Sequence, residues 1–573
     1  MPGDYAQALG WYQKAADLGA PVTTTNIANL FQCGQGAPVD HAQANAWFHR
    51  PAAMGQAHAM RILGIQCQNG QGVPVDLAQA MVWFKKAADL GDAVAMINIG
   101  ILYERGQGVP VDYAQAMAWY QKAADLGHTA AMRNIGVQYH NGQGVPRDYA
   151  QAMAWYKKAA DLGDPAAMTD VGNLFRRGEG VPVDHAQAKV WFHRAADLGH
   201  AVAMRNIGAQ YHNGQGMPVD FAQAMVWYQK AAGLGDGCAM ANVGILYRHG
   251  QGVPVDYAQA MAWFQKAADL GDPAAMSQIG FLFHRGEGVP VDYAQAGAWF
   301  RRAANLGHAD AMRSLGIQYQ QGQGVPVDYA QARQWFKKAA DAGSASAMVN
   351  MGRLHYEGQG VPVDYVQARQ WFQKAADLGD ASAMKGLGLI YHHGHGVPPD
   401  GVRASQWYKK AADLGDTGAM INIGGLYDAG QGVMQDFAQA MAWNKKAAAL
   451  GDPMGMINVA LLYEYGCGMP EDHVKAMQWF RKAADLGQPE AMRWIGVLYH
   501  GGKGVAPDYR LAMQWYQKAA DLGNAEAMRC IGDLYHNGQA VPRDFAAAMQ
   551  WYRKAAGLGS AGALRRIEHM SRY

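Results

Sequence analysis

The residues of this sequence that could do chemistry recur at fixed spacings, and most of them are cationic or aromatic. Arg133, Val137 and His140 lie at i, i+4 and i+7, so a helix would place them in one stripe on one face. The next five copies of this stripe carry further cations and apolar residues and no acid. Arginine binds carboxylates through charge-assisted hydrogen bonds, and aromatic side chains anchor protein partners. The stripe therefore predicts a binding site for a protein or peptide that is acidic or amphipathic.

The candidate binding residues are the cations of the stripe together with its aromatic residues and one further tryptophan. They are Arg133, His140, Arg176, Arg205, His212, Arg248, Phe281, His284, Arg313, Tyr356 and Trp494. Tyr356 and Trp494 are predicted aromatic anchors. The alternative is a solvated helix face that binds nothing, because polar side chains are usually exposed.

The histidines raise the question of a metal site. One position of the stripe carries histidine in six copies, which are His140, His212, His284, His392, His500 and His536. Neighbouring helices lie about 8–10 Å apart, whereas the nitrogens that share one zinc ion lie within about 4 Å of each other. Successive copies therefore cannot chelate one ion. The local cluster of His392, His393 and His395 is the remaining metal candidate, and we expect no metal and no cofactor.

Catalytic motifs are missing from the sequence. It contains no nucleophile elbow, phosphate-binding loop, HExxH pair or dinucleotide fingerprint. A lattice of repeats also brings no set of different residue types together in one pocket. We therefore expect no catalytic residues, no enzymatic activity and no small-molecule substrate.

The elements that position these residues follow a strict period. Aspartate recurs every 36 residues from Asp4 to Asp544, and sixteen of the 17 tryptophans stand seven residues after it. Such a period predicts an all-α solenoid of sixteen helix-turn-helix repeats. We expect one continuous array over residues 1–573. Its N-terminal end, residues 1–75, is irregular, since Pro51 interrupts a helix pattern there, and residues 560–573 form a capping helix.

One copy shows how the local sequence specifies the two helices. Asp112 is predicted to cap the first helix, and Gln115 to bond back to the Asp112 amide as in a capping box. The apolar stripe of this helix consists of Ala116, Trp119, Tyr120, Ala123 and Leu126. Gly127 ends the first helix. In the second helix Gly136 has no side chain, which permits close packing against a partner helix.

The composition of the chain argues against several classes of protein and of binding partner. Apolar residues make up 50% of the chain and the net charge is +2, so neither disorder nor a strongly basic nucleic-acid binder is indicated. No apolar stretch is long enough to span a membrane. The N-terminus lacks the pattern of a signal peptide, and five unpaired cysteines suit a reducing compartment, so we expect a cytoplasmic protein. Nucleic-acid binding by helical repeats is the alternative function.

The repeat also resembles a known family. Its W-x-x-K-A-A-x-x-G, A-x-x-x-[IL]-G-x-x-Y and G-x-G-V…D segments, seen in Trp83–Gly91, Ala95–Tyr103 and Gly106–Asp112, are similar to those of Sel-one-like repeats, relatives of tetratricopeptide repeats. The resemblance implies a right-handed superhelix of helix pairs that acts as a scaffold or adaptor, as in bacterial members. It implies that the second helix of each pair lines a concave groove. A repeat-based hydrolase, as proposed for cysteine-rich relatives, is a further alternative.

Overall fold

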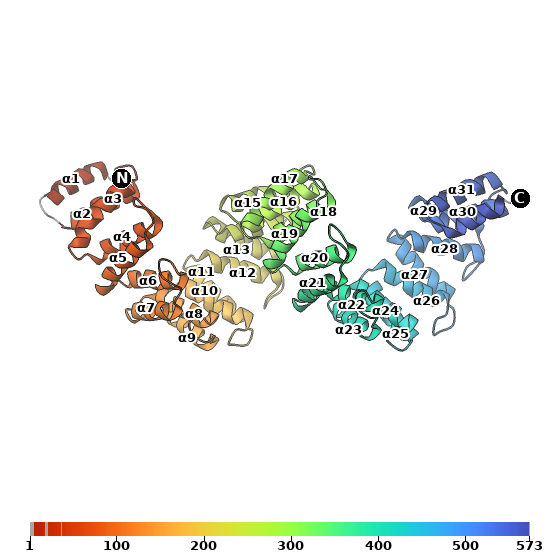
Figure 1. The fold of residues 1–573 in the computed structure, drawn as a ribbon, viewed down its shortest axis with the longest axis horizontal. Coiled ribbons are helices and arrows are strands. Elements are labelled where there is room, and N and C mark those ends of the chain that lie inside the picture. The colour runs from red at the N-terminus through yellow and green to blue at the C-terminus, as the bar shows by residue number, and fades with distance from the viewer. Residues whose placement is uncertain (1–4, 18–20, 36, 572–573) are drawn as a thin grey trace. The chain divides into compact units, whose positions relative to one another are not determined.

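The computed structural model describes residues 5–17, 21–35 and 37–571, which form 32 α-helices joined by short turns (Figure 1). Asp4 of the first repeat and residues 572–573 of the predicted capping helix lie outside the described residues. Helices alternate in consecutive pairs, so the predicted α-solenoid of helix-turn-helix repeats is confirmed. The chain consists of two units, Met1–Val291 and Asp292–Tyr573. Continuity of the array from one unit to the next stays a prediction.

The first unit contains the helices α1 to α16. Their bounds are α1 Tyr5–Asp17, α2 Pro21–Cys33, α3 His41–Ala53, α4 Ala57–Asn69, α5 Leu77–Asp89, α6 Ala93–Arg105, α7 Tyr113–Asp125, α8 Thr129–Asn141, α9 Tyr149–Asp161, α10 Pro165–Arg177, α11 His185–Asp197, α12 Ala201–Asn213, α13 Phe221–Gly233, α14 Gly237–His249, α15 Tyr257–Asp269 and α16 Pro273–Arg285. Pro51 lies near the end of α3, which still continues to Ala53.

The second unit contains the helices α17 to α32. Their bounds are α17 Tyr293–Asn305, α18 Ala309–Gln321, α19 Tyr329–Asp341, α20 Ala345–Glu357, α21 Tyr365–Asp377, α22 Ala381–His393, α23 Gly401–Asp413, α24 Thr417–Ala429, α25 Phe437–Ala449, α26 Pro453–Glu464, α27 His473–Asp485, α28 Pro489–Gly501, α29 Tyr509–Asp521, α30 Ala525–Asn537, α31 Phe545–Gly557 and α32 Ala561–Met570. We call odd-numbered helices the odd helices and the others the even helices.

The predicted N-cap is confirmed for the odd helices from α3 onward, but the return bond of the capping box is not. The Asp112 carboxylate accepts a hydrogen bond of 2.9 Å from the backbone N–H of Gln115, which satisfies one free donor of the helix start. The amide of Asp112 donates instead to the carbonyl of Tyr103 in the preceding even helix, at 3.0 Å. The predicted bond from the Gln115 side chain is therefore wrong, because a tertiary bond uses the same donor.

The core lies mainly between each even helix and the odd helix that follows it. A Cβ atom added at Gly136 of α8 would lie 2.5 Å from the ring of Tyr156 in α9, so only glycine allows this approach. Tyr156 is 1% exposed. Equivalent rings fill the same place along the array, among them Phe84, Tyr120, Phe192 and Phe264, all fully buried. Each repeat therefore completes its core with the ring of the next repeat.

Two members of the predicted apolar stripe on α7 are not core residues. Ala116, Tyr120 and Ala123 are buried as predicted. Leu126 follows the last residue of the helix and is 58% exposed, so its assignment to the core is wrong. Trp119 is half-buried, with the Lys122 Nζ 4.0 Å from the ring centroid. Tryptophan at this position therefore pairs with a cation at the core margin.

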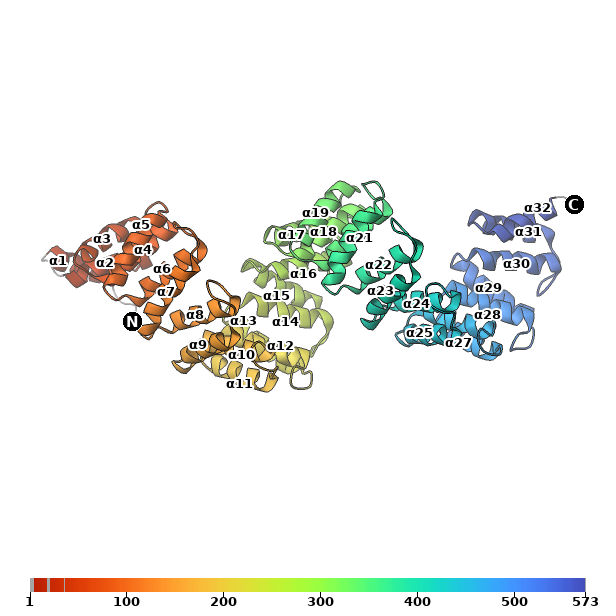
Figure 2. The same ribbon diagram turned by 60° about the horizontal axis from the view of Figure 1, so that its bottom comes forward.

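The even helices lie on the inner side of each unit (Figures 1 and 2). Helices α10 and α12, and likewise α14 and α16, approach each other, and the second unit repeats this at α24 and α26 and at α30 and α32. Among the described helices, no two successive odd helices come as close to each other. We call the partly exposed side of the even helices the inner face. It carries the predicted stripe.

Candidate binding face of the even helices

The inner face varies widely in residue type, whereas the core position beneath it stays buried and is leucine, isoleucine or glutamine. The position of Val137 is held in other copies by residues as different as Phe281, Leu389 and Asp533, and all of them are partly exposed. The next residue along each helix, from Gln66 to Leu534, is buried in every copy. A helix that buries one position and exposes its neighbour has one side that is constrained by packing and one side that is not. The predicted stripe is therefore accessible on a uniform scaffold.

The first stripe position ties neighbouring repeats together. Its cations reach the capping aspartate of the next even helix, in the pairs Arg61–Asp92 at 3.1 Å, Arg205–Asp236 at 3.3 Å and Lys385–Asp416 at 2.9 Å. Arg133 instead pairs with Asp170 of α10 at 2.6 Å. Burial raises the pKa of the Asp170 carboxyl, and the Arg133 guanidinium opposes that shift. These cations already have acidic partners within the chain.

The last stripe position makes a second set of contacts, with the loop of the next repeat. His140 lies 3.1 Å from Glu179, Arg248 lies 2.6 Å from Glu287, and Tyr356 lies 2.8 Å from His395. Arg248 is 7% exposed and also donates to Gln278. The stripe positions hold no acid in these copies, as the sequence indicated, but acids reach the stripe from other positions. The predicted excess of positive charge is therefore largely neutralised.

The remaining stripe residues lie on the same face with local contacts. Arg176 donates to Asn173 at 3.3 Å, and the Nε atom of Arg313 lies 4.0 Å from Asp310. The His212 ring meets the Phe221 ring at 5.4 Å, and burial lowers the pKa of both His212 and His284. Phe281 is partly exposed. The structure thus places these residues on one face of successive even helices, but not in one pocket.

Trp494 has a different environment from the stripe. It lies beside the stripe on α28, and its indole stacks on the Phe480 ring with centroids 5.7 Å apart and an interplanar angle of 4°. The Arg493 guanidinium lies 4.5 Å from the indole centroid. The ring is thus held between an aromatic face and a cation of its own chain. As an anchor for a partner, Trp494 is already engaged.

The histidine cluster does not form a metal site. The rings of His392 and His393 stack with centroids 4.6 Å apart, and the ring of His395 lies 5.4 Å from that of His393. His395 Nδ1 lies near the Tyr356 hydroxyl, and His392 Nε2 lies 2.8 Å from the Gln431 amide oxygen. Within the described residues, no group of three or more potential ligands could hold a metal ion.

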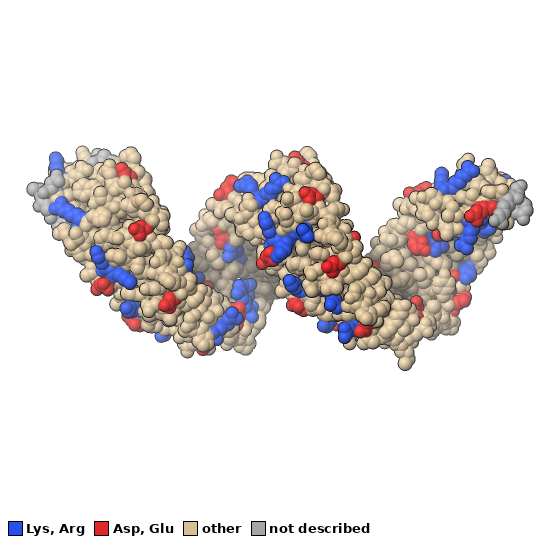
Figure 3. All heavy atoms as spheres, viewed as in Figure 1, with Lys and Arg blue, Asp and Glu red and all other residues tan. Residues whose placement is uncertain are grey.

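The surface carries charged side chains of both signs, and the helices are short. On the face drawn in Figure 3, lysine and arginine alternate with aspartate and glutamate over most of the described helices. None of the helices in the described ranges is long and apolar enough to cross a membrane. The surface thus carries both signs of charge close together.

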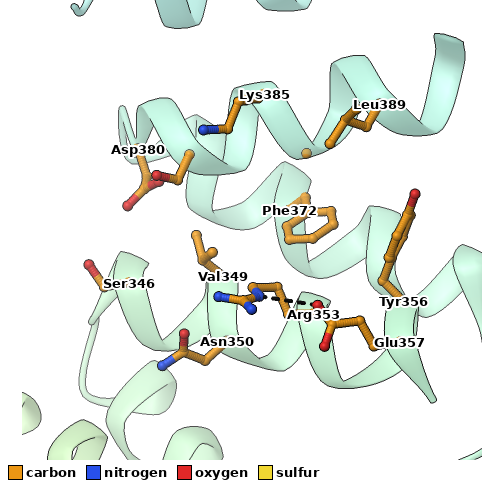
Figure 4. Close-up of a pocket in the computed structure, with 12 residues that line it drawn as sticks. Ser346, Val349, Asn350, Arg353, Tyr356, Glu357, Phe372, Asp380, Lys385 and Leu389 are labelled. Atoms are coloured by element: carbon orange, nitrogen blue, oxygen red, sulfur yellow. Dashed lines mark hydrogen bonds and ion pairs between the residues drawn. The ribbon is translucent and has the colours of Figure 1, made fainter. Parts of the chain in front are cut away.

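The inner face of the second unit contains a pocket of about 460 Å³ that the spacing of residues did not predict. Val349 and Arg353 of α20 line one wall, Lys385 and Leu389 of α22 line the other, and Phe372 of α21 lies between them (Figure 4). Pockets of about 300–1,000 Å³ hold small molecules or side chains. One signal for it existed in the sequence. Gly386 stands where other copies carry a side chain, usually asparagine.

The stacked helix pairs, each completing the core of its neighbour, define an α-solenoid of the tetratricopeptide-like class. The chain belongs to the Sel1 repeat family. The Sel1 repeat matches residues 1–19, 24–56, 57–92, 93–128, 129–164, 165–200, 201–236, 239–272, 273–308, 309–344, 345–380, 381–416, 417–452, 453–488, 489–524 and 525–560. Repeats of this family generally serve as scaffolds for protein interactions and are typically not enzymes.

Solved structures of bacterial relatives are similar to this chain. A protective antigen present in uropathogenic Escherichia coli strains, which displays an SLR fold, is 32% identical, and the match covers 79% of this chain and 96% of that one, with a TM-score of 0.43. A Sel1 repeat protein from Oxalobacter formigenes is 31% identical over 57% of this chain and 93% of that one, with a TM-score of 0.41. No curated protein matches the chain.

Proposed function

We propose that this chain is a protein-binding scaffold whose inner face holds a peptide segment of a partner protein. The observation that carries the proposal is the contrast between a fixed core and a variable exposed face on the same helices. The residue beneath Val137 is buried in every copy, while the Val137 position itself changes from apolar to charged along the array. Binding surfaces of repeat proteins vary in this way on a constant frame.

The contacts of the cations indicate which part of a partner the face would hold. Arg133, Arg205 and Arg248 already pair with carboxylates of the next repeat. The face also carries partly exposed apolar residues, Ile245 and Phe281 among them, and the Arg285 guanidinium lies 5.8 Å from the Phe281 ring centroid. A few buried anchors, aromatic residues and arginine above all, contribute most of the binding energy at typical interfaces, and these arginines are already paired within the chain. The proposed segment is therefore amphipathic, with its apolar side on the inner face and any acidic groups in a supporting role.

A cross-linking and titration experiment tests the proposal. A photoreactive benzoylphenylalanine in place of Phe281 captures a partner in native extract, and the partner is then purified. Its affinity is measured by calorimetry for the wild type and for the double variant Ile245→Ser, Phe281→Ser. The control double variant is Leu234→Ser, Leu270→Ser, which removes apolar groups that are 55% and 60% exposed at the ends of odd helices. We expect a loss of roughly tenfold or more for the first variant and almost no change for the control.

Two results would count against the proposal. Equal losses in both double variants would place binding outside the inner face. The scaffold function itself fails if the cross-linker captures no protein at 281 or at other inner-face positions such as Ile245.

A further inference from the structure

The pocket between α20 and α22 exists because one copy of the repeat lacks a side chain. Gly386 occupies the position that Asn206, Asn422 and Trp494 hold in other copies. A Cβ atom at 386 would lie 3.1 Å from two atoms of the Phe372 ring, so this ring lies directly beneath the missing side chain. Phe372 is 4% exposed, whereas its equivalents Phe336 and Phe480 are 0% exposed. The pocket therefore opens onto the face of an otherwise buried ring.

The same chain shows what fits on that ring. Three repeats further on, Trp494 takes the place of Gly386 and Phe480 takes the place of Phe372. The Trp494 indole lies parallel to the Phe480 ring, with centroids 5.7 Å apart. The Glu490 carboxylate lies close to the indole, and the Arg493 guanidinium lies 4.5 Å from the indole centroid. Offset stacking at such distances is favourable beyond the burial of apolar area. This repeat contains, within one chain, the filled form of the pocket.

The open pocket keeps the stacking ring and a cation, and it differs from the Trp494 site at other positions. Glu357 stands where the Tyr465 ring meets the Trp494 indole, with centroids 6.0 Å apart. Lys385 stands at the position of Arg493, and its Nζ lies 2.9 Å from Asp416. Ser382 stands at the position of Glu490 and supplies a hydroxyl oxygen that can accept a hydrogen bond from an indole N–H. Val349 and Leu389 form apolar walls on either side of Phe372 (Figure 4). A stacking face, a cation and an acceptor are thus arranged for a planar aromatic group.

We propose that this pocket binds an aromatic side chain of a partner peptide, tryptophan first of all, whose ring stacks on Phe372 as Trp494 stacks on Phe480. The inference deepens the proposed function and rests on it for the peptide that carries the ring. The volume of about 460 Å³ admits one large ring with part of its backbone. Arg353, which pairs with Glu357 at 3.5 Å, and Asn350 supply polar groups at the rim for that backbone.

A titration of the full chain with a small probe tests the pocket without any partner protein. Methyl groups of Val349 and Leu389 are observed by NMR while N-acetyl-L-tryptophanamide is added, and N-acetyl-L-leucinamide serves as the apolar, non-aromatic comparison. We expect saturable ring-current shifts at both residues and binding of the tryptophan amide at least fivefold tighter than that of the leucine amide. The variant Gly386→Trp fills the pocket with its own indole and should weaken binding at least tenfold. Gly425→Trp is the control, since it adds an indole to the inner face at a position with open space around it.

The reciprocal variant keeps the test informative if Gly386→Trp perturbs the fold. Trp494→Gly uncovers Phe480 and should create a second site for the tryptophan amide, reported by methyl shifts at Val497 and Ile457. The inference is overturned if the wild type shows no saturable shifts, if both amides bind equally well, or if Gly386→Trp binds as the wild type does. Binding of a partner along the inner face without binding of the amide would overturn this inference alone. Binding of the amide without any protein partner would leave the pocket standing and refute the scaffold function.

Discussion

Gln138 is expected to weaken the protein, and its replacement by leucine to stabilise it. The side chain is 1% exposed, and neither its amide nitrogen nor its oxygen has a hydrogen-bond partner. Leu102 and Leu174 hold the same position in the two adjacent repeats and are buried as fully. An unsatisfied buried polar group costs about 1–3 kcal/mol. Gln138→Leu should therefore raise the free energy of local unfolding by about 1–3 kcal/mol, which corresponds to roughly 5- to 150-fold slower exchange.

Hydrogen exchange measured by mass spectrometry is the suitable assay. A repeat array opens locally, so a single melting temperature would average over many repeats. Amides of α8 and α9 should exchange more slowly in Gln138→Leu than in the wild type. Gln210→Leu is the matched control, two repeats further on. The Gln210 amide donates to the His185 carbonyl at 3.2 Å, so its removal leaves that acceptor without its partner and the gain should be smaller. Equal gains in both variants, or unchanged exchange in Gln138→Leu, would refute the reasoning.

Two further predictions concern backbone strain and pH. Gly252 and Gly271 both have positive φ, at +73° and +85°, but a Cβ atom at 252 would lie 2.8 Å from Phe221 whereas the space around 271 is open. Hydrogen exchange around each site should show a cost of about 1–2 kcal/mol for Gly271→Ala and about 1–3 kcal/mol more for Gly252→Ala, and equal costs would show that the contact is irrelevant. Burial lowers the pKa of seven histidines below 6.5. Because the unfolded chain therefore binds more protons than the folded chain in this range, the free energy of unfolding should fall as the pH is lowered from about 7 to about 5.5. Thermal unfolding measured between these two pH values tests the prediction, and a melting temperature that does not change with pH would contradict it. The seven histidines are His58, His200, His212, His284, His355, His393 and His500.

The fold could be predicted from the sequence because its determinants are local and repeated. Asp112 caps its helix within one turn, and its aspartate recurs in all sixteen copies. Gly136 recurs in most copies, and its period indicates packing against the next helix. Leu126 was misassigned because helical spacing alone does not show that the helix has ended one residue earlier. Trp119 is half-buried beneath the Lys122 ammonium, a pairing that an apolar helix period does not describe.

The candidate site could be predicted only as a face. Spacing placed Arg133 and Arg248 on the same side of the even helices, and the structure agrees. Their partners, Asp170 and Glu287, stand at different positions of the next repeat, and pairing across repeats depends on how the helices stack. The pocket at Gly386 was missed for a related reason. An absent side chain becomes a cavity only through the ring that lies beneath it.

The ties between repeats have a consequence for how this array can change in copy number. Arg248 pairs with Glu287, and Glu464 bonds to Lys503 at 3.1 Å, so these junctions carry different charges in opposite order. Loss of one repeat unit by recombination after Arg248 would set this nearly buried guanidinium opposite Gln323, and the same event after Glu464 would set a 2% exposed carboxylate opposite Gln539. Buried charges without a counter-ion are costly. Copies that are similar in sequence thus differ in the charges at their junctions. Loss of one repeat should therefore lower the stability of the array more at some junctions than at others.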